Sequence, residues 1–249
     1  HGLEADGVIG KRTIFAMNIP VADRIQQIIV TMERWRWMPA DMGSRYLLAN
    51  IPGFQLQLVE AGRVVKTMRT VVGRRDRPTP VLASEITYLE LNPYWYVPTT
   101  IAGEDLLPKI QANPNFLVRQ NFRVFDGWAP GARELDPAAI DWANVSASRF
   151  PYRLRQEPGA LNALGAVKFM FPNPHAIYLH DTPAKNLFAR ETRAYSSGCI
   201  RLNEPFELAY HLLARQVSNP QSFFDSRLST GQQTRIDLRE PIPVHLVYR

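Results

Sequence analysis

The spacing of apolar side chains changes along the chain and divides it into stretches of different structure. In residues 22–38, Ile25, Ile28, Ile29 and Met32 recur at the three- and four-residue intervals of one helix face. The pattern predicts a helix whose apolar side packs on the domain that follows it.

The stretch before this helix is short and punctuated by glycine. Residues 1–20 predict a loop and then a short helix with Thr13 near its N-cap, which ends at Pro20. One helix of this size cannot form a core by itself, so we expect it to be the end of a small module.

Residues 45–97 change to strand character. The segments YLLANI, FQLQLVE, VVKTMRTVVG and EITYLELN are rich in β-branched and aromatic residues. Turn signals separate them, at Pro52-Gly53, Ala61-Gly62 and residues 73–80. Because no helical pattern lies between these strands, the stretch predicts an antiparallel meander.

The strand signal fades in residues 98–165. Short helices are expected at 104–111 and 137–143, joined by loops, and such a long loop-rich stretch inside a β domain is often functional. Its apolar side chains offer a surface for packing: Phe116, Phe122, Val124, Phe125, Trp128 and Trp142. We therefore expect an inserted lid subdomain.

Strands return after residue 166, in AVKFMF, AIYLHD and GCIRL. A helix is predicted over residues 205–215, and two last strands around 236–238 and 244–248. The pattern as a whole predicts a mainly β (α+β) fold, a sandwich with one long helix near its end. The expected units are a module end at 1–20, a connecting helix and linker at 21–44, and a domain at 45–249 that contains the 98–165 lid.

Composition narrows the class of protein. With 249 residues, 45% of them hydrophobic and 21% charged, the chain fits a globular protein better than a disordered one. No apolar run reaches the roughly 18–20 residues of a membrane-spanning helix. The start, HGLEADGVIG, lacks the features of a signal peptide and an initiator Met, so we expect a trimmed piece of a longer protein.

The basic charge is scattered. The net charge of +6 permits an acidic partner, but the longest Lys/Arg run is Arg74-Arg75, and no Cys/His finger or Gly-rich phosphate loop is present in the sequence. A nucleic-acid partner is therefore not expected.

The candidate chemistry is concentrated in residues 178–201. Cys199 is the single cysteine, which excludes an internal disulfide and any multi-cysteine metal site. A lone cysteine is more often inert and buried than reactive. However, His180 and Cys199 lie at the ends of two predicted strands, and a neighbouring imidazole can activate a thiol. The small Ser197-Gly198 pair allows a sharp turn that points N–H groups at an oxyanion, so the joint pattern favours acyl transfer.

The remaining histidines suggest no metal site. His175 lies in a Pro-rich loop, His211 in a helix and His245 in the last strand, and the spacing of His175 and His180 is not that of a helical zinc pair. We expect neither a metal nor a cofactor.

The motifs H-D-T and S-S-G-C-I-R resemble the signature of the L,D-transpeptidase (YkuD-type) catalytic domain. The resemblance extends over residues 45–97, including Val72-Gly73 and Thr79-Pro80, and over 163–249. The D-G-x-x-G-x-x-T pattern of residues 6–13 resembles the end of a peptidoglycan-binding module.

Three departures from the short family members resemble one subgroup. Ser197 stands where many members carry a second His, Asp181 stands where many carry Gly, and the 98–165 insertion is absent from the small enzymes. All three are similar to the large periplasmic enzymes of Gram-negative bacteria, which carry a capping subdomain. The resemblance therefore implies a periplasmic location.

The resemblance also implies a reaction and its partners. Cys199 would attack a tetrapeptide stem of peptidoglycan, release D-Ala as a thioester forms, and pass the acyl group to the side-chain amine of a diamino acid, which gives a 3→3 cross-link. Carbapenem β-lactams would acylate the same thiol.

It further implies roles for the surrounding residues. His180 would be the base, oriented by a backbone carbonyl in the 181–182 region, and the N–H groups of Gly198 and Cys199 would be oxyanion donors. Tyr178 would assist them or would simply be a half-buried strand residue. Arg201 would shape the site, bind a substrate carboxylate, or form a surface ion pair.

Two other functions stay open on the sequence. One is a sortase-like cysteine transpeptidase, which also has the order His, Cys, Arg but usually places the Cys after a Thr-rich strand and much farther from the His. The other is a catalytically weak peptidoglycan-binding protein of the same fold. A papain-like peptidase is disfavoured because its Cys precedes its His.

Overall fold

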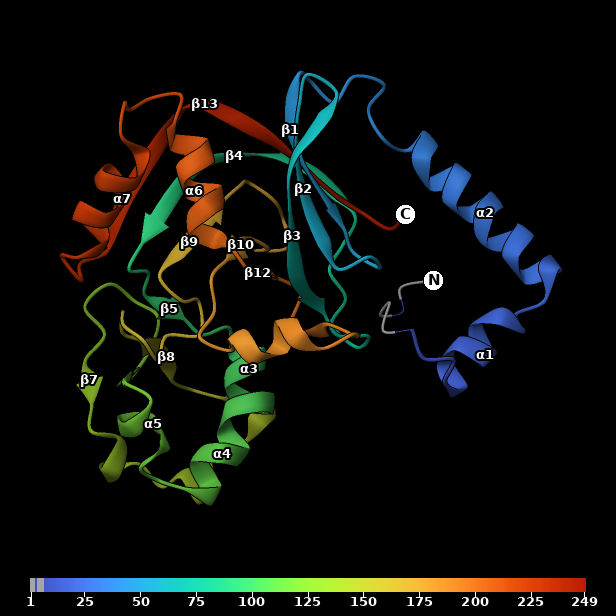
Figure 1. The fold of residues 1–249 in the computed structure, drawn as a ribbon. Coiled ribbons are helices and arrows are strands. Elements are labelled where there is room, and N and C mark those ends of the chain that lie inside the picture. Colours follow the sequence, from blue (N-terminus) through green and yellow to red (C-terminus); the bar gives the residue numbers. More distant parts are fainter. Residues whose placement is uncertain (1–2, 4–6) are drawn as a thin grey trace.

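A closed ring of hydrogen-bonded strands forms the centre of the protein in the computed structural model, which describes residues 3 and 7–249 (Figure 1). The strand order is β11-β3-β12-β10-β9-β4-β13-β1-β2, and β2 also pairs with β3, so the sheet closes on itself. Closure leaves β11 as an appended edge strand, and it gives each of the other strands a hydrogen-bonded neighbour on both sides.

The strands of this barrel are β1 (Arg45–Asn50), β2 (Gln55–Glu60), β3 (Arg63–Gly73), β4 (Leu82–Leu91), β9 (Val167–Met170), β10 (Leu179–His180), β11 (Ala194–Ser196), β12 (Ile200–Leu202) and β13 (Thr234–Val247). Helices α6 (Pro205–Leu213) and α7 (Pro220–Leu228) cover one side of it (Figure 1). Their buried side chains, such as Leu212 and Phe224, join the barrel core around Leu47, Leu89 and Phe169.

The predicted strands are present, but their pairing differs from a meander. β1, β2 and β3 are successive antiparallel neighbours, as predicted. β4 instead pairs with β9 and β13, and β1 pairs with β13 in parallel. The sheet therefore mixes parallel and antiparallel pairs. The parallel pair of β1 with β13 arises where the last strand of the chain returns to lie beside the first.

Two predictions about the C-terminal part were wrong in detail. The two last strands are one strand, β13, whose pairing with β4 shifts in register between Asp237 and Ile242. Pro241 and Pro243 lie at this irregularity, where the missing N–H groups weaken the sequence pattern of a continuous strand. The helix predicted over 205–215 is present as α6, but it is not the one long helix expected, because a second nine-residue helix, α7, follows it after a turn before Pro220.

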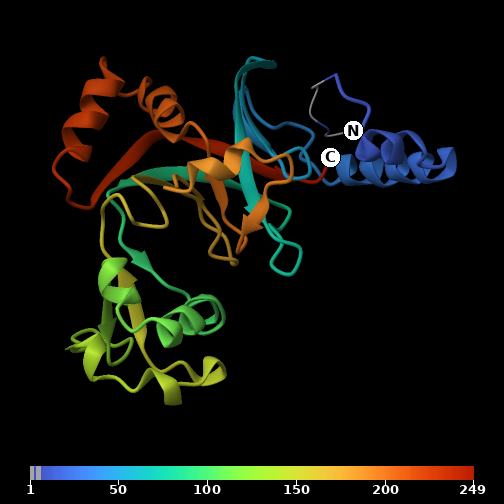
Figure 2. The same ribbon diagram turned by 60° about the horizontal axis from the view of Figure 1, so that its bottom comes forward.

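The 98–165 insertion folds around a core of its own and contains more strand than the sequence predicted. A four-stranded sheet in the order β5-β8-β6-β7 is formed by β5 (Trp95–Tyr96), β6 (Phe122–Phe125), β7 (Glu134–Leu135) and β8 (Arg153–Gln156). β5 lies just before residue 98. A continuous helical segment follows it, made of α3 (Thr99–Ile101), the π-helical η1 (Ala102–Leu106) and α4 (Leu107–Ala112), and α5 (Phe116–Arg119) leads into β6. Short 3-10 turns occupy Pro137–Ala139, Trp142–Asn144 and Ala147–Arg149. Figure 2 shows this lobe, here called the cap, beside the barrel.

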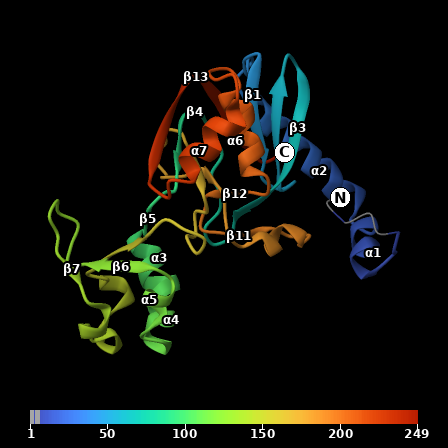
Figure 3. The same cartoon turned by 60° about the vertical axis from the view of Figure 1, so that its left-hand side comes forward.

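The N-terminal helices α1 (Lys11–Met17) and α2 (Val21–Arg36) extend from the barrel on a different side from the cap (Figure 3). Thr13 lies within α1, whose N-cap is Gly10, and Asp6 of the module motif lies outside the described residues. The prediction that the apolar face of α2 packs on the next domain was wrong, because Ile28 is 59% exposed and Met32 58% exposed.

The C-terminal end of α2 contacts the barrel domain. The Arg34 guanidinium lies 5.5 Å from the Tyr248 ring centroid, and the Arg249 guanidinium lies 5.2 Å from the Trp35 ring. Among the described helices, none is both long and apolar enough to cross a bilayer.

The separate cores of cap and barrel predict that each can be destabilised independently. Leu154 is fully buried in the cap core, so Leu154→Ala should cost about 2–5 kcal/mol of cap stability. Hydrogen exchange should then show faster exchange in β6 and β8 while the barrel strands stay protected. Phe169→Ala, at the equivalent depth in the barrel, is the matched control and should loosen the barrel. Equal loss of protection in both lobes after Leu154→Ala would contradict two separate cores.

Candidate active site

The candidate nucleophile and base are brought together by the parallel pairing of β10 with β12. Leu179 pairs with Ile200 and His180 with Arg201, and Leu179 and Ile200 are fully buried in the barrel core. Because side chains alternate along a strand, His180 and Arg201 lie on the opposite face. Cys199, one position before Ile200, shares this face and is a diagonal neighbour of His180.

His180 is held as a neutral imidazole. It is 4% exposed, and its Nδ1 lies 2.5 Å from the Asp181 carbonyl oxygen. A carbonyl oxygen only accepts, so Nδ1 carries the proton and Nε2 has the free lone pair of a base. Burial, and then the positive charge of Arg201, lower the pKa of His180 to about 3, although the carbonyls of Asp181 and Leu164 act in the opposite direction.

Cys199 is held mainly as a thiol. Burial raises the pKa of Cys199 to about 11, although hydrogen bonds from Tyr178 and the charge of Arg201 favour the thiolate. The same burial, followed by the charge of the Cys199 thiolate, raises the pKa of Tyr178 well above its ordinary value. Within residues 7–249 no hydrogen bond joins Cys199 to His180. A thiol in this state can act as a nucleophile only if a base removes its proton as the sulfur attacks.

The turn before Cys199 is shaped by Ser196 and Gly198. The Ser196 hydroxyl donates to the Cys199 carbonyl oxygen at 2.5 Å and accepts from the Gly198 N–H at 3.1 Å. Gly198 has φ +117°, a conformation that side chains rarely adopt, and a Cβ there would lie 2.9 Å from Ile177 Cδ1. The Gly198 N–H, which was expected to be an oxyanion donor, is thus engaged by Ser196 in this structure. For the Cys199 N–H, the described part of the chain provides no acceptor.

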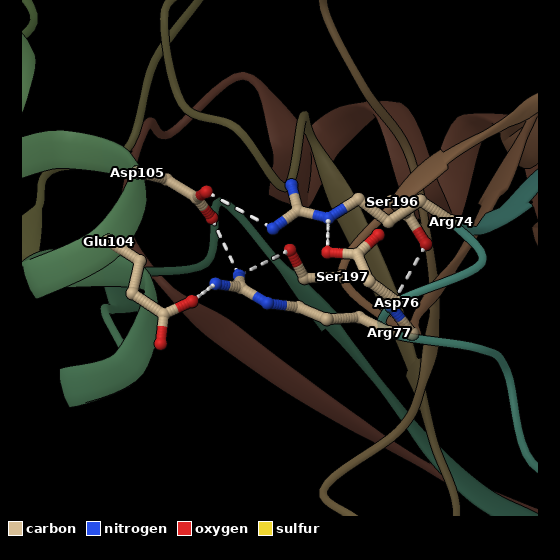
Figure 4. Close-up of polar contacts among 8 residues, drawn as sticks. Arg74, Asp76, Arg77, Glu104, Asp105, Ser196 and Ser197 are labelled. Carbon is tan, nitrogen blue, oxygen red and sulfur yellow. Dashed lines mark hydrogen bonds and ion pairs between the residues drawn. The ribbon is translucent and has the colours of Figure 1, made fainter.

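A second loop, residues 73–79, binds this turn at three consecutive residues. The Arg74 N–H donates to the Ser196 carbonyl oxygen at 2.9 Å, and the Arg77 Nη1 donates to Ser197 Oγ at 3.2 Å (Figure 4). The Thr79 hydroxyl donates to the Gly198 carbonyl oxygen at 2.7 Å. Sequence reasoning noted Thr79 only as part of a turn and did not identify Arg74 or Arg77.

The cap contacts the same loop through its acidic helical segment. Asp105 accepts from Arg77 Nη1 at 2.7 Å and from Arg74 Nη2 at 3.2 Å, and Glu104 pairs with Arg77 (Figure 4). The Arg77 side chain is only 15% exposed, so these ion pairs are better shielded from water than typical surface pairs. Arg77 thus contacts both the cap and Ser197, next to the nucleophile turn.

The other predicted residues support the site from its sides. Arg201 is largely buried, which lowers the pKa of its guanidinium, and its Nε has no hydrogen-bond partner among the described residues. Asp181 accepts from the Ala166 N–H at 2.9 Å and from Lys185 Nζ at 2.6 Å. These contacts hold the loop beside His180.

No group of three or more possible metal ligands is found in the part of the chain that the structure describes. His175 and His211 are exposed, and His245 is buried in β13 against the Tyr46 ring.

Comparisons with known proteins agree on one family. A model of the L,D-transpeptidase catalytic domain (YkuD) matches residues 44–231. A Haemophilus influenzae protein named as a candidate L,D-transpeptidase is 36% identical over 223 residues, which are 90% of this chain and 44% of that protein. The chain therefore spans less than half the length of this curated relative.

Solved L,D-transpeptidases resemble the chain more distantly. The enzyme LdtMt1 in complex with imipenem is 14% identical, with a TM-score of 0.38 over 82% of this chain and 59% of that chain. L,D-transpeptidase 3 from Mycobacterium tuberculosis is 11% identical, with a TM-score of 0.38 over 82% and 61% of the two chains. The family assignment thus rests on the domain match and the curated relative.

The half-buried Cys199 thiol and the buried His180 imidazole predict the pH dependence of Cys199 alkylation. With a thiol pKa near 11 the reactive thiolate is scarce at pH 7, so the iodoacetamide rate should rise about tenfold per pH unit from pH 7 to 10. No step is expected at pH 6.5, because the pKa of His180 is lowered to about 3 and the ring is already neutral there. Mass spectrometry of the single alkylated cysteine measures the rate. A plateau reached at neutral pH would instead indicate a preformed thiolate–imidazolium pair.

Proposed function

The chain belongs to the L,D-transpeptidase family, and from that premise we propose that it cross-links peptidoglycan stem peptides by 3→3 bonds through a thioester on Cys199. The observation that supports this most is the placement of Cys199 and His180 on one face of adjacent strands, with the imidazole in the tautomer of a general base. The substrate lies in the cell wall, so we place the domain in the periplasm.

In the first half of the reaction, Cys199 Sγ attacks the carbonyl between the diamino acid and the terminal D-Ala of a donor tetrapeptide. His180 Nε2 takes the thiol proton as the carbon–sulfur bond forms, and then gives it to the leaving amine as the carbon–nitrogen bond breaks. The Cys199 N–H is assigned as a donor to the developing oxyanion, and the Tyr178 hydroxyl, which hydrogen-bonds the Cys199 thiol at rest, is assigned as its helper. The products are D-Ala and a thioester.

In the second half, the side-chain amine of an acceptor stem attacks the thioester. His180 removes a proton from that amine, the carbon–sulfur bond breaks, and the released thiolate recovers a proton as the new amide forms. At neutral pH the imidazole is free to act in both halves, since its lowered pKa keeps it unprotonated in the resting enzyme. No cofactor is required in this scheme.

Arg201 is assigned to recognition of a substrate carboxylate. A guanidinium that is buried without a hydrogen-bond partner for its Nε has lost water contacts that an anionic ligand could replace. The stem peptide carries carboxylates on its D-Ala and on its diamino acid, close to the bond that Cys199 attacks. Carbapenem β-lactams also carry a carboxylate and should acylate Cys199, which gives one equivalent of adduct on the single cysteine.

The cap is assigned to holding the donor and excluding water. Its acidic segment contacts Arg74 and Arg77, and Arg77 contacts Ser197, so cap docking and the nucleophile turn share one set of contacts. A thioester exposed to water would hydrolyse before meeting an amine. Docking of the cap at this position therefore favours cross-linking over hydrolysis.

The reaction is tested by incubating the protein with purified disaccharide tetrapeptide and analysing the products by mass spectrometry. The wild type should release D-Ala and form a cross-linked dimer, and Cys199→Ala should lose both while retaining its melting temperature. Removing a nucleophile commonly lowers the rate by several orders of magnitude. His180→Ala should lose turnover too, while carbapenem acylation should slow with it.

Two outcomes would contradict this function. Turnover by Cys199→Ala at the wild-type rate would exclude a thioester. Binding of peptidoglycan by the wild type without D-Ala release or a carbapenem adduct would instead favour a catalytically weak wall-binding protein of the same fold.

The cap assignment is tested by point variants, because a deletion within residues 104–150 would remove much of the cap core. Glu104→Gln combined with Asp105→Asn removes the charges that bind Arg74 and Arg77 at nearly constant volume. This variant should raise the ratio of hydrolysed tripeptide to cross-linked product and lower cross-linking, while iodoacetamide alkylation of Cys199 stays unchanged.

Glu134→Gln is the matched control, since it breaks the exposed Arg123–Glu134 ion pair within the cap and away from Arg77. It should leave the product ratio unchanged. A wild-type product ratio in the Glu104/Asp105 variant would exclude a role for these contacts in catalysis.

A further inference from the structure

We propose that Thr79 is the positioning residue of the oxyanion site: its hydroxyl fixes the Gly198–Cys199 peptide so that the Cys199 N–H faces the reacting carbonyl. The inference rests on the proposed acyl transfer by Cys199, because an oxyanion forms only when the thiol attacks a carbonyl. Alkylation of the same thiol forms no oxyanion and therefore serves as the control reaction.

Thr79 is built into the structure as a bridge rather than as a surface side chain. It is 1% exposed, and its Oγ1 accepts from the Gly73 N–H at 2.9 Å while donating to the Gly198 carbonyl oxygen at 2.7 Å. A hydroxyl has one proton, and the Gly198 carbonyl is the acceptor that receives it. The direction of both hydrogen bonds is thereby fixed.

The bond to the Gly198 carbonyl also sets the direction of the next N–H group. A trans peptide is planar, and its C=O and N–H bonds point in opposite directions. Because Thr79 holds the carbonyl on one side of the Gly198–Cys199 peptide, the Cys199 N–H must point to the other side. Gly198 itself has φ +117° and could otherwise rotate, since glycine is the least restrained residue.

The Cys199 N–H is a donor that the turn leaves available, directly at the nucleophile. The Gly198 N–H donates to Ser196 Oγ at 3.1 Å, whereas the Cys199 N–H meets no acceptor among the described residues. An oxyanion site with few backbone donors depends strongly on the direction of each N–H bond. Thr79 sets the direction of the Cys199 N–H without touching the substrate.

The position of Thr79 is itself held from both sides. A Cβ at Gly73 would collide with the backbone of Arg77, Pro78 and Thr79, so glycine at 73 permits the loop to close against itself. The Tyr248 hydroxyl donates to the Thr79 carbonyl oxygen at 3.2 Å. The bridge therefore joins the end of β3, the nucleophile turn and the C-terminal end of the barrel.

The test compares Thr79→Val, which keeps the shape and removes the hydroxyl, with Thr79→Ser, which keeps the hydroxyl. Carbapenem acylation of Cys199 and iodoacetamide alkylation of Cys199 are measured for each variant by mass spectrometry. Losing one oxyanion donor typically costs about 100- to 1,000-fold in rate. Misaligning one should cost about 10- to 100-fold, so Thr79→Val should slow acylation by that factor.

The loss should lie in the first-order rate constant of acylation. The affinity of the non-covalent carbapenem complex and the rate of alkylation should both stay unchanged. Thr79→Ser should acylate at the wild-type rate. A merely structural role would instead lower acylation and alkylation together, and both in step with the melting temperature.

Acylation of Thr79→Val at the wild-type rate would overturn the inference. If Thr79→Val does not fold, Thr79→Ser still decides: loss of acylation in that variant, with normal alkylation, would show that a hydroxyl at position 79 is not sufficient. Failure of the proposed function looks different, because wild-type protein would then be alkylated but never acylated.

Discussion

Three hydrogen bonds from the loop at residues 73–79 hold the turn that carries Cys199, and the geometry of the proposed active site depends on them. They bind Ser196, Ser197 and Gly198 in succession, through a backbone N–H, a guanidinium and a hydroxyl. The loop follows β3, whose antiparallel pairing with β12 brings the two segments together. Closure of the barrel thus does more than bury apolar residues, since it fixes a turn whose glycine would otherwise be free to rotate.

Burial of the reactive pair determines its resting state. The site is closed enough to raise the pKa of Cys199 and lower the pKa of His180, so both groups are neutral at pH 7. A neutral pair needs no compensating counter-ions and is poorly reactive until a substrate is bound. The cap also lowers the net charge near the site, because its acidic segment neutralises Arg74 and Arg77 at the edge of the site. The arrangement suits the proposed reaction, in which water competes with an amine for the thioester.

Local sequence determined the elements that have strong periodicity. The helix at 21–36, the strands from 45 to 91 and the helix after Cys199 follow from the spacing of apolar residues. The cap sheet was missed because its strands are two to four residues long, and such short runs carry little pattern. The partners of β4 and β13 were missed because pairing between distant strands depends on the closed barrel, which no local pattern encodes. The exposure of the α2 face likewise depends on where the helix leaves the barrel.

At the site, the sequence by itself determined which residues are candidates for the chemistry, because the order of His180, Ser197, Gly198 and Cys199 is local. Only the tertiary structure decided which backbone groups are free to act. The Gly198 N–H is occupied by Ser196, and the Gly198 carbonyl is bound by Thr79, which lies 119 residues away in the chain. Whether an N–H is available depends on which acceptor the fold places beside it. That placement is set by strand register over long sequence separations, so it could not be deduced from the spacing of neighbouring residues.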